Sequence, residues 1–269
     1  MTSLWVQRDH LKSVFEIRRY FRNPWLIILL RLGLVQLPYF PYRMRCGTKP
    51  LVMLARPTTT SMADLFVLRE VFVKEAYRDV LPLLGDAKQI RLIDIGANLG
   101  SFTIWMDRKL GVREAYCFEP EPDSFRLLDF NLRMNDCTGA KAIESAVGGT
   151  ARTIQISLKQ ESPGGTSIYD SSTGSAGRSV PVLAFQQWLN ELPGNFDLLK
   201  VDCEGAEWEI FRQTGASSFQ RFRAIVAEVH GDPERRAAVS EFKALAERSG
   251  FRTVRWDNKE QGLYFGVRD

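Results

Sequence analysis

The chain has 269 residues, of which 45% are hydrophobic and 25% are charged, and its net charge is +4. This is ordinary globular composition, long enough for one large α/β domain with an appendage. The basic residues are too dispersed for a nucleic-acid footprint, so we expect no nucleic-acid partner. Four scattered cysteines (Cys46, Cys117, Cys137 and Cys203) indicate neither a zinc site nor a disulfide framework, and a reducing cytoplasm fits them.

Residues 1–60 form a basic and apolar extension, in which residues 1–56 carry ten Lys or Arg against two acids. The run WLIILLRLGLVQL at 25–37 is interrupted by Arg31. A membrane span needs roughly 20 apolar residues, so we expect neither a transmembrane helix nor a cleaved signal peptide. Two interpretations stay open. Residues 15–37 form an amphipathic helix that rests on a membrane or a partner, or a helix that covers the main domain.

The main domain is predicted to span residues 61–269 and to begin with a helix. Thr60 or Ser61 can cap this helix, and Leu65, Leu68 and Phe72 recur at helical spacing. From residue 89, strand and helix patterns alternate, which predicts a mostly parallel sheet with helices on both faces and one antiparallel strand. The predicted strands lie at 91–95, 114–120, 141–148, 151–158, 197–202 and 223–231, with a hairpin formed by 251–256 and 262–268.

One long segment, 162–179, is rich in Gly and Ser and has low propensity for regular structure. Two interpretations are equally open for it: a lid that closes over a substrate, or a solvated linker.

Polar and acidic residues follow nearly every predicted strand. In an open parallel sheet, ligands bind beyond the carboxyl ends of the strands, where the strand order reverses. The loop Asp94-Ile-Gly-Ala-Asn-Leu-Gly100 places two glycines where a backbone turns tightly or approaches a ligand. Its spacing is not the dinucleotide pattern G-x-G-x-x-G. Glu119, 25 residues beyond Asp94, can accept hydrogen bonds from ribose hydroxyls.

The stretch DLLKVDCEGAEWEIF at 197–211 begins as a buried strand and then brings Lys200, Asp202, Glu204 and Glu207 within eight positions. Burying uncompensated charge costs several kcal/mol per ion, roughly, even after relaxation. We therefore expect this strand end to open into a crevice.

DIGANLG at 94–100, FEP at 118–120 and K-x-D-x-E-G-x-E at 200–207 together resemble the FkbM-type family of S-adenosylmethionine-dependent methyltransferases. The resemblance covers about residues 64–269. It implies a Rossmann-like sheet of seven strands and S-adenosylmethionine as cofactor. It also implies that Gly96, Asn98 and Gly100 wrap the methionine part of the cofactor.

The resemblance further implies that Glu119 holds the cofactor ribose and that Ser145 lies at the adenine pocket. Asp94 opens the glycine loop and is counted among the cofactor-binding residues. Asn131 and Asn135 match the family's paired asparagines, and they either cap a helix or touch a ligand. The extension before residue 60 is expected to be dispensable for cofactor binding.

The predicted reaction is methyl transfer to a hydroxyl oxygen of a small molecule, sugar or glycan. Asp202, Glu204, Glu228 and His230 are the candidate bases that face the crevice, and Lys200 offsets part of the acidic charge. The ordinary pKa of histidine makes His230 a plausible base near neutral pH. A divalent ion held by these acids and His230 is an alternative, but no metal is assigned. A nicotinamide-dependent oxidoreductase and a noncatalytic binding module are the alternative functions.

Overall fold

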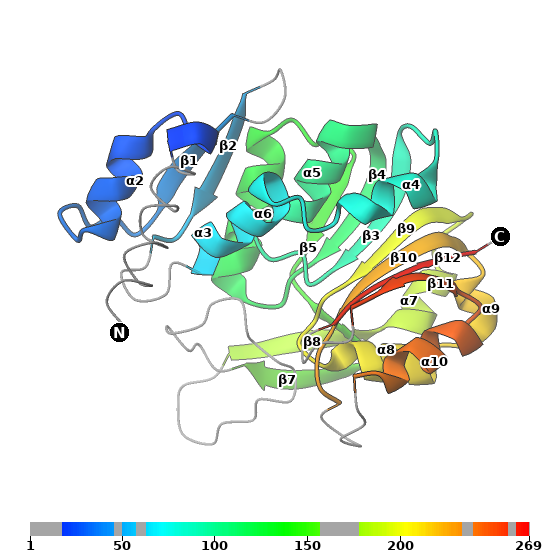
Figure 1. The fold of residues 1–269 in the computed structure, drawn as a ribbon. Helices are drawn as coiled ribbons and strands as arrows, with labels where there is room; N and C mark the ends of the chain where they lie inside the picture. The colour runs from blue at the N-terminus through cyan, green and yellow to red at the C-terminus, as the bar shows by residue number, and fades with distance from the viewer. Residues whose placement is uncertain are drawn as a thin grey trace, which may run out of the picture.

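The computed structural model describes residues 18–45, 50–57, 63–156, 178–232, 239–257 and 262–268, and Figure 1 shows the arrangement of its elements. The predicted lid at 162–179 lies almost wholly outside these ranges, as do Cys46 and residues 233–238 of a predicted helix. Within the described ranges, no helix is both long enough and apolar enough to cross a membrane.

A seven-stranded sheet is the centre of the molecule, in the order β11-β12-β10-β9-β3-β4-β5. All neighbouring pairs are parallel except those of β12, which runs antiparallel to both β10 and β11. The predicted α/β fold, Rossmann-like with one antiparallel strand, is therefore confirmed. The strands are β3 (Ile90–Ile95), β4 (Val112–Phe118), β5 (Ala140–Ile143), β9 (Phe196–Val201), β10 (Phe222–Val229), β11 (Arg252–Trp256) and β12 (Gly262–Val267).

Two hydrophobic cores lie on opposite faces of this sheet, because successive strand residues point to opposite sides. Leu92 and Leu198 belong to one core, whereas Ile93 and Leu199 belong to the other. Helices α5 and α6 cover the first face, and α7 to α10 cover the second (Figure 1). The bounds are α5 (Ser101–Leu110), α6 (Pro122–Met134), α7 (Phe185–Asn190), α8 (Ala206–Gln213), α9 (Ala216–Phe219) and α10 (Glu241–Arg248).

A second, three-stranded sheet departs from the sequence-based expectation. The predicted single strand at 141–148 is divided into β5 and β6 (Ala146–Gly148). β6 pairs in parallel with β8 (Arg178–Ala184), and β7 (Arg152–Ile156) pairs antiparallel with β8. The break falls at Glu144 and Ser145, where the chain leaves the large sheet.

The N-terminal part consists of α2 (Pro24–Arg31) and a hairpin of β1 (Phe40–Met44) and β2 (Leu51–Ala55). Phe40, Tyr42 and Met53 are buried in the same core as α5 and α6. The predicted boundary at residue 60 therefore does not coincide with a gap in packing. The domain boundary itself stays a prediction. The expectation that residues before 60 are dispensable for cofactor binding is not supported by this packing.

Asn131 and Asn135 explain how the hairpin is attached. The Asn131 amide accepts a hydrogen bond from Leu54 N at 2.7 Å and donates to Leu54 O at 3.0 Å, and Asn135 Nδ2 donates to Val52 O at 2.8 Å. Their side chains thus extend the β2 edge. The predicted helix capping is confirmed for Asn135, which is the C-cap of α6 and whose Nδ2 also donates to Asn131 O at 2.9 Å. The segment that follows contains α3 (Ala63–Leu68), the π-helix η1 (Arg69–Val73), the 3₁₀-helix η2 (Arg78–Val80) and α4 (Leu81–Leu84).

Candidate active site

The strand order reverses between β3 and β9, which places the ligand crevice beyond the carboxyl ends of these two strands. Here the two sequence motifs touch through their backbones. Gly96 has φ +75°, and a Cβ atom on it would lie 1.7 Å from the Asp202 carbonyl oxygen. Asp202 N also donates to Ile95 O at 3.0 Å. The close approach of the second motif is therefore as strong a reason for glycine at position 96 as any ligand contact.

The side chain of Lys200, on β9, contacts the end of β3 and the start of the glycine loop. Its ammonium is almost completely buried and donates to Gly96 O at 2.6 Å. It also lies 3.3 Å from Asp94 Oδ1 and 3.3 Å from Asp202 Oδ2. Burial alone would lower the pKa of Lys200, but the charges of Asp202 and Asp94 raise it above its ordinary value. Lys200 is thus a permanent cation that fixes the glycine loop.

Asp94 is fully buried and contributes no surface to the crevice. Besides Lys200, it accepts a hydrogen bond from Thr103 Oγ1 at 2.7 Å. In this structure Asp94 therefore positions the loop and the following helix, and direct cofactor contact by its side chain stays a prediction.

Glu119 connects the end of β4 with the glycine loop. Asn98 N donates to its Oε2 at 2.9 Å, and Glu121 N donates to its Oε1 at 2.8 Å. Burial raises the pKa of Glu119 to about 7 even though both backbone hydrogen bonds oppose this shift. A carboxylate has about four lone-pair sites, so each oxygen retains capacity for a ribose hydroxyl.

The loop next to Glu119 also carries buried polar atoms that need a partner. Across the described ranges, Asn98 Oδ1 and Ser101 Oγ are buried without a hydrogen-bond partner. Gly100, with φ +79°, turns the chain into α5, whose N-terminal N–H groups favour polar or negative ligand groups. Because buried polar atoms are normally satisfied, these residues fit the polar methionine and ribose parts of S-adenosylmethionine.

Ser145 lies where the sequence placed it, after β5, but its polar groups are engaged. Its hydroxyl lies 2.7 Å from Ala146 O and 2.9 Å from Pro181 O, and its N–H donates to Ile143 O. Ser145 therefore ties the two sheets together at their junction. Its contact with adenine stays a prediction without support from these hydrogen bonds.

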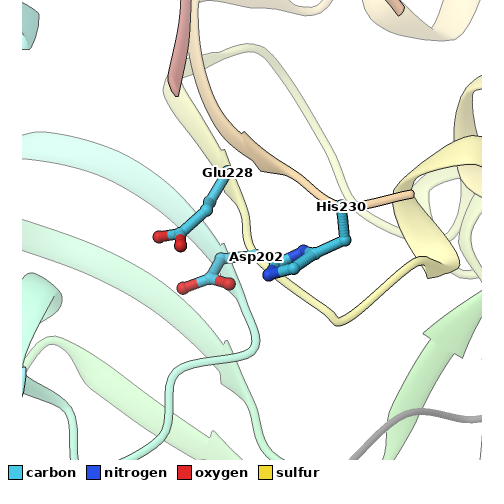
Figure 2. Close-up of side chains that lie close together, drawn as sticks. All are labelled: Asp202, Glu228 and His230. Carbon is cyan, nitrogen blue, oxygen red and sulfur yellow. The ribbon is translucent and has the colours of Figure 1, made fainter. Parts of the chain in front are cut away.

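Three side chains from β9 and β10 converge on the crevice. Asp202 follows β9, Glu228 lies at the end of β10 and His230 follows it, and one ligand atom of each lies within 4.8 Å of the others. Figure 2 shows the two carboxylates and the imidazole pointing toward one another. The predicted gathering of Asp202 and His230 thus agrees with their placement, and Glu228 joins them.

Glu207 holds the imidazole of His230. This carboxylate is fully buried, and its Oε1 lies 2.8 Å from His230 Nδ1 and accepts from His230 N at 2.7 Å. Its other oxygen accepts from Gly205 N at 2.8 Å. His230 Nε2 lies 3.5 Å from Glu204 Oε2. Glu204 is therefore a neighbour of the His230 imidazole, and its own backbone has a positive φ of +54°.

These neighbours change the titration of His230. Burial lowers the pKa of the imidazole, but the hydrogen bond to Glu207 and the charges of Glu207, Glu204 and Asp202 raise it to about 9. The pKa of His230 thus lies above the ordinary value on which the sequence-based argument for a general base relied, because of Glu207. The role of His230 as a base stays a prediction.

The pKa near neutrality that was expected of His230 is found at Glu228 instead. The charge of Asp202 and then burial raise the pKa of Glu228 to about 7, against the opposing charges of His230 and Lys200. The hydroxyl of the buried Tyr77 lies 3.4 Å from Glu228 Oε2. A carboxylate with this pKa is well suited to accept a proton near neutral pH.

The same three side chains have the donor types that bind a divalent cation. Two cations already face the two carboxylates, however: the Lys200 ammonium, 3.3 Å from Asp202 Oδ2, and the protonated His230. These charges compensate the acids, and a divalent ion at this cluster stays an alternative prediction.

Sequence reasoning underrated Glu207 and Glu228. Glu207 was noticed only as part of the K-x-D-x-E-G-x-E pattern, because nothing local shows that it reaches a residue 23 positions away. Glu228 was among the four candidate bases but was not singled out, because nothing local in β10 shows that the charge of Asp202 raises its pKa.

Comparisons with known proteins agree with this geometry. The profile of the methyltransferase FkbM domain matches residues 94–253, which include the glycine loop and the cluster. Methyltransferase 1 of Beauveria bassiana (strain ARSEF 2860) is 26% identical over 206 residues, covering 69% of this chain and 80% of the relative. Methyltransferase sdnD of Sordaria araneosa is 26% identical over 221 residues, covering 71% and 83%.

Among solved structures, a methyltransferase FkbM from Methylobacillus flagellatus KT has a TM-score of 0.44 and 13% identity. The match covers 67% of this chain and 44% of that one. The matched domain extends over more than half of the sequence and contains both motifs, the buried Glu119 and the convergent acids of the crevice. The chain therefore belongs to the FkbM family of methyltransferases and uses S-adenosylmethionine as its cofactor.

Proposed function

We propose that this methyltransferase acts on a hydroxyl oxygen of a small molecule, sugar or glycan, and that the hydroxyl binds between Asp202, Glu228 and His230. The observation that carries the proposal is the convergence of these three groups at the end of β9 and β10, beside the glycine loop. The oxidoreductase and the noncatalytic module are set aside, because the family is one of methyltransferases.

The cofactor supplies an electrophilic methyl group when it is bound. The chain supplies position and a proton acceptor. As the new O–C bond forms and the S–C bond breaks, the hydroxyl proton passes to the carboxylate pair of Asp202 and Glu228.

His230 has a different task in this proposal. With Nδ1 bonded to Glu207, its protonated ring directs Nε2 toward the acids, where it stabilises the carboxylate form. It thereby keeps the acceptor site negative enough to bind a hydroxyl donor. A base role for His230 is not part of the proposal, because its pKa of about 9 leaves it protonated at neutral pH.

The test is a panel of hydroxylated small molecules, sugars and glycans, with formation of S-adenosylhomocysteine as the readout and product mass as the check. Glu228→Gln and Asp202→Asn should each lower the methyl-transfer rate by roughly 10²-fold or more, the scale for losing a general base. Cofactor affinity should stay within a factor of about two. Glu241→Gln, an exposed acid in the first turn of α10, is the matched control and should turn over normally.

Two outcomes would contradict the proposal. Normal turnover by both cluster variants would remove the carboxylates from the chemistry. Methylation of a nitrogen or carbon atom, with no product from any hydroxyl, would leave a methyltransferase whose acceptor chemistry we have misassigned.

A further inference from the structure

The N-terminal part exposes an apolar surface that the rest of the described molecule does not match. Among the residues that the structure describes, six of the ten exposed large hydrophobic side chains lie between residues 25 and 39. Leu34 is 69% exposed, Leu32 65% and Trp25 63%. The other members of this set, which we call the apolar surface, are Leu26, Leu37 and Tyr39. A concentration of this kind on a protein surface marks an interaction site.

The helix α2 that carries part of this surface is packed against the domain on its other side. α2 already buries Ile27 and Leu30 in the core of the domain. The segment between Asn23 and Pro41 is closed at its base, where Asn23 Nδ2 donates to Pro41 O at 2.9 Å. The apolar surface is therefore an additional face on an anchored element, at the outer edge of the molecule beside β1 (Figure 1).

Arginines surround this surface. Residues 18–45 contain six arginines and no acidic residue. The guanidinium of Arg18 lies 5.3 Å from the centre of the Trp25 ring. Arg22 N donates to Arg43 O at 2.7 Å, so these two exposed arginines lie on adjacent strands of backbone next to α2. Every charged residue within the described segment 18–45 is therefore basic, although Glu75, Asp107 and Asp136 of other segments line a pocket together with Arg45.

We propose that the apolar surface and its arginines bind the face of a bilayer with anionic headgroups. Exposed leucines with Trp and Tyr enter the boundary between headgroups and acyl chains, and the arginines bind the phosphates. Each component is present within one segment. The eight-residue α2 is far too short to span a bilayer, but it is long enough to lie in the interface.

A second copy of the chain is a poorer occupant. A two-fold dimer places the same patch of each copy against the other, so the arginines of one would face those of the other. Like charges at short range are repulsive, and no acid in residues 18–45 offsets them. A layer of anionic lipid has the opposite charge and an apolar interior.

The experiment uses the full chain and sedimentation with two kinds of vesicle: phosphatidylcholine alone, and phosphatidylcholine mixed with phosphatidylserine. The wild type should partition at least about tenfold more strongly onto the mixed vesicles, and added salt should weaken this binding because it screens the arginines. Leu32→Ser with Leu34→Ser should lower partition about tenfold or more, since two leucines lose their burial in lipid.

Two further variants separate the components. Arg22→Gln with Arg43→Gln should remove the preference for anionic vesicles while a weak apolar binding persists. Phe130→Ser with Val254→Ser, which changes two exposed apolar residues elsewhere, is the matched control and should bind like the wild type. Circular dichroism and S-adenosylhomocysteine binding confirm that each variant is folded.

Three results would overturn the proposal: no binding of the wild type to mixed vesicles, equal binding by the leucine variant, or self-association through Leu32 and Leu34 without vesicle binding. All three are independent of the acceptor chemistry, because methyl transfer to a soluble acceptor is measured separately.

Discussion

Glu119 is nearly inaccessible to solvent and has a pKa of about 7, raised by burial. Hydroxyl groups of the cofactor ribose donate hydrogen bonds, so they bind the ionised form better than the protonated form. Affinity for S-adenosylhomocysteine should therefore increase as pH rises through about 7, and level off above it. Calorimetric titration across this pH range measures the effect.

The variant Glu119→Gln provides the control. It cannot ionise, so its affinity should be weaker by about 1–3 kcal/mol above pH 7 and nearly independent of pH. A wild-type affinity that is flat across the same range would contradict the assignment of Glu119 to the ribose. The stability sign is the opposite: a carboxylate whose folded pKa is raised favours folding least above that pKa, so its contribution to stability declines as pH rises toward about 7.

Glu207 acts on His230 through a hydrogen bond and its charge, and both raise the pKa of the imidazole. In Glu207→Gln the pKa of His230 should fall from about 9 toward its ordinary value near 6.5. The chain has only two histidines, His10 and His230, so NMR titration of the imidazole signals can follow this change directly.

Glu204→Gln is the comparison for this measurement. Glu204 lies 3.5 Å from Nε2 and is partly exposed, whereas Glu207 lies 2.8 Å from Nδ1 and is buried, so the Glu204 variant should lower the pKa less. Equal shifts in both variants, or no shift in Glu207→Gln, would show that Glu207 does not govern the histidine.

At this scale, sequence reasoning located most of the cluster but not what its members do. The alternation of a strand placed Lys200 and Asp202 on one face, which was correct. It did not reveal that Lys200 also reaches Asp94, 106 positions away, which requires β3 and β9 to be neighbours. The titration of His230 depends equally on a non-local partner and was misjudged for that reason.

Asn131 makes the hydrogen bonds that connect the β1–β2 hairpin both to α6 and to the glycine loop. Asn131 bonds both the N–H and the carbonyl of Leu54, and its amide also donates to Leu99 O at 3.0 Å in the glycine loop. Asn131→Ala should lower the free energy of unfolding by about 1–3 kcal/mol, because buried polar groups lose their partners. It should also accelerate hydrogen exchange of the Leu54 amide.

Urea unfolding and amide exchange measure these two effects. Asn190→Ala removes an exposed asparagine at the end of α7 and should change stability by no more than about 0.5 kcal/mol. If Asn131→Ala is as stable as this control, the hairpin is held by its apolar contacts and by Asn135 without a contribution from Asn131.

The elements themselves were largely predictable, since strands ending in glycine or acids alternate with amphipathic helices. The division of 141–148 into β5 and β6 was not. Both halves are short and have β-forming residues, and only the pairing of β6 with β8, more than 30 residues later, gives the second half a different sheet. The sequence pattern indicates where strands form, but it does not indicate which strands pair with one another.

The whole molecule is organised around one sheet with a core on each face. The first core includes Phe21, Tyr42 and Met53 together with Leu128 and Phe265. Residues from the extension therefore stabilise the same unit that contains the glycine loop. The extension and the main domain differ in composition and charge, which is what the sequence reports, but they are continuous in packing.

The contact between Gly96 and the Asp202 carbonyl has a consequence for how such an enzyme can change. There the carbonyl oxygen of Asp202 occupies the space that a Cβ atom on residue 96 would need, so the two motifs lie this close only while residue 96 is glycine. A larger residue at position 96 would have to displace the main chain that carries Asp202, whereas side chains elsewhere around the crevice can be exchanged without moving this contact. Change in this methyltransferase is therefore most restricted where two backbones meet and least restricted at the side chains around them.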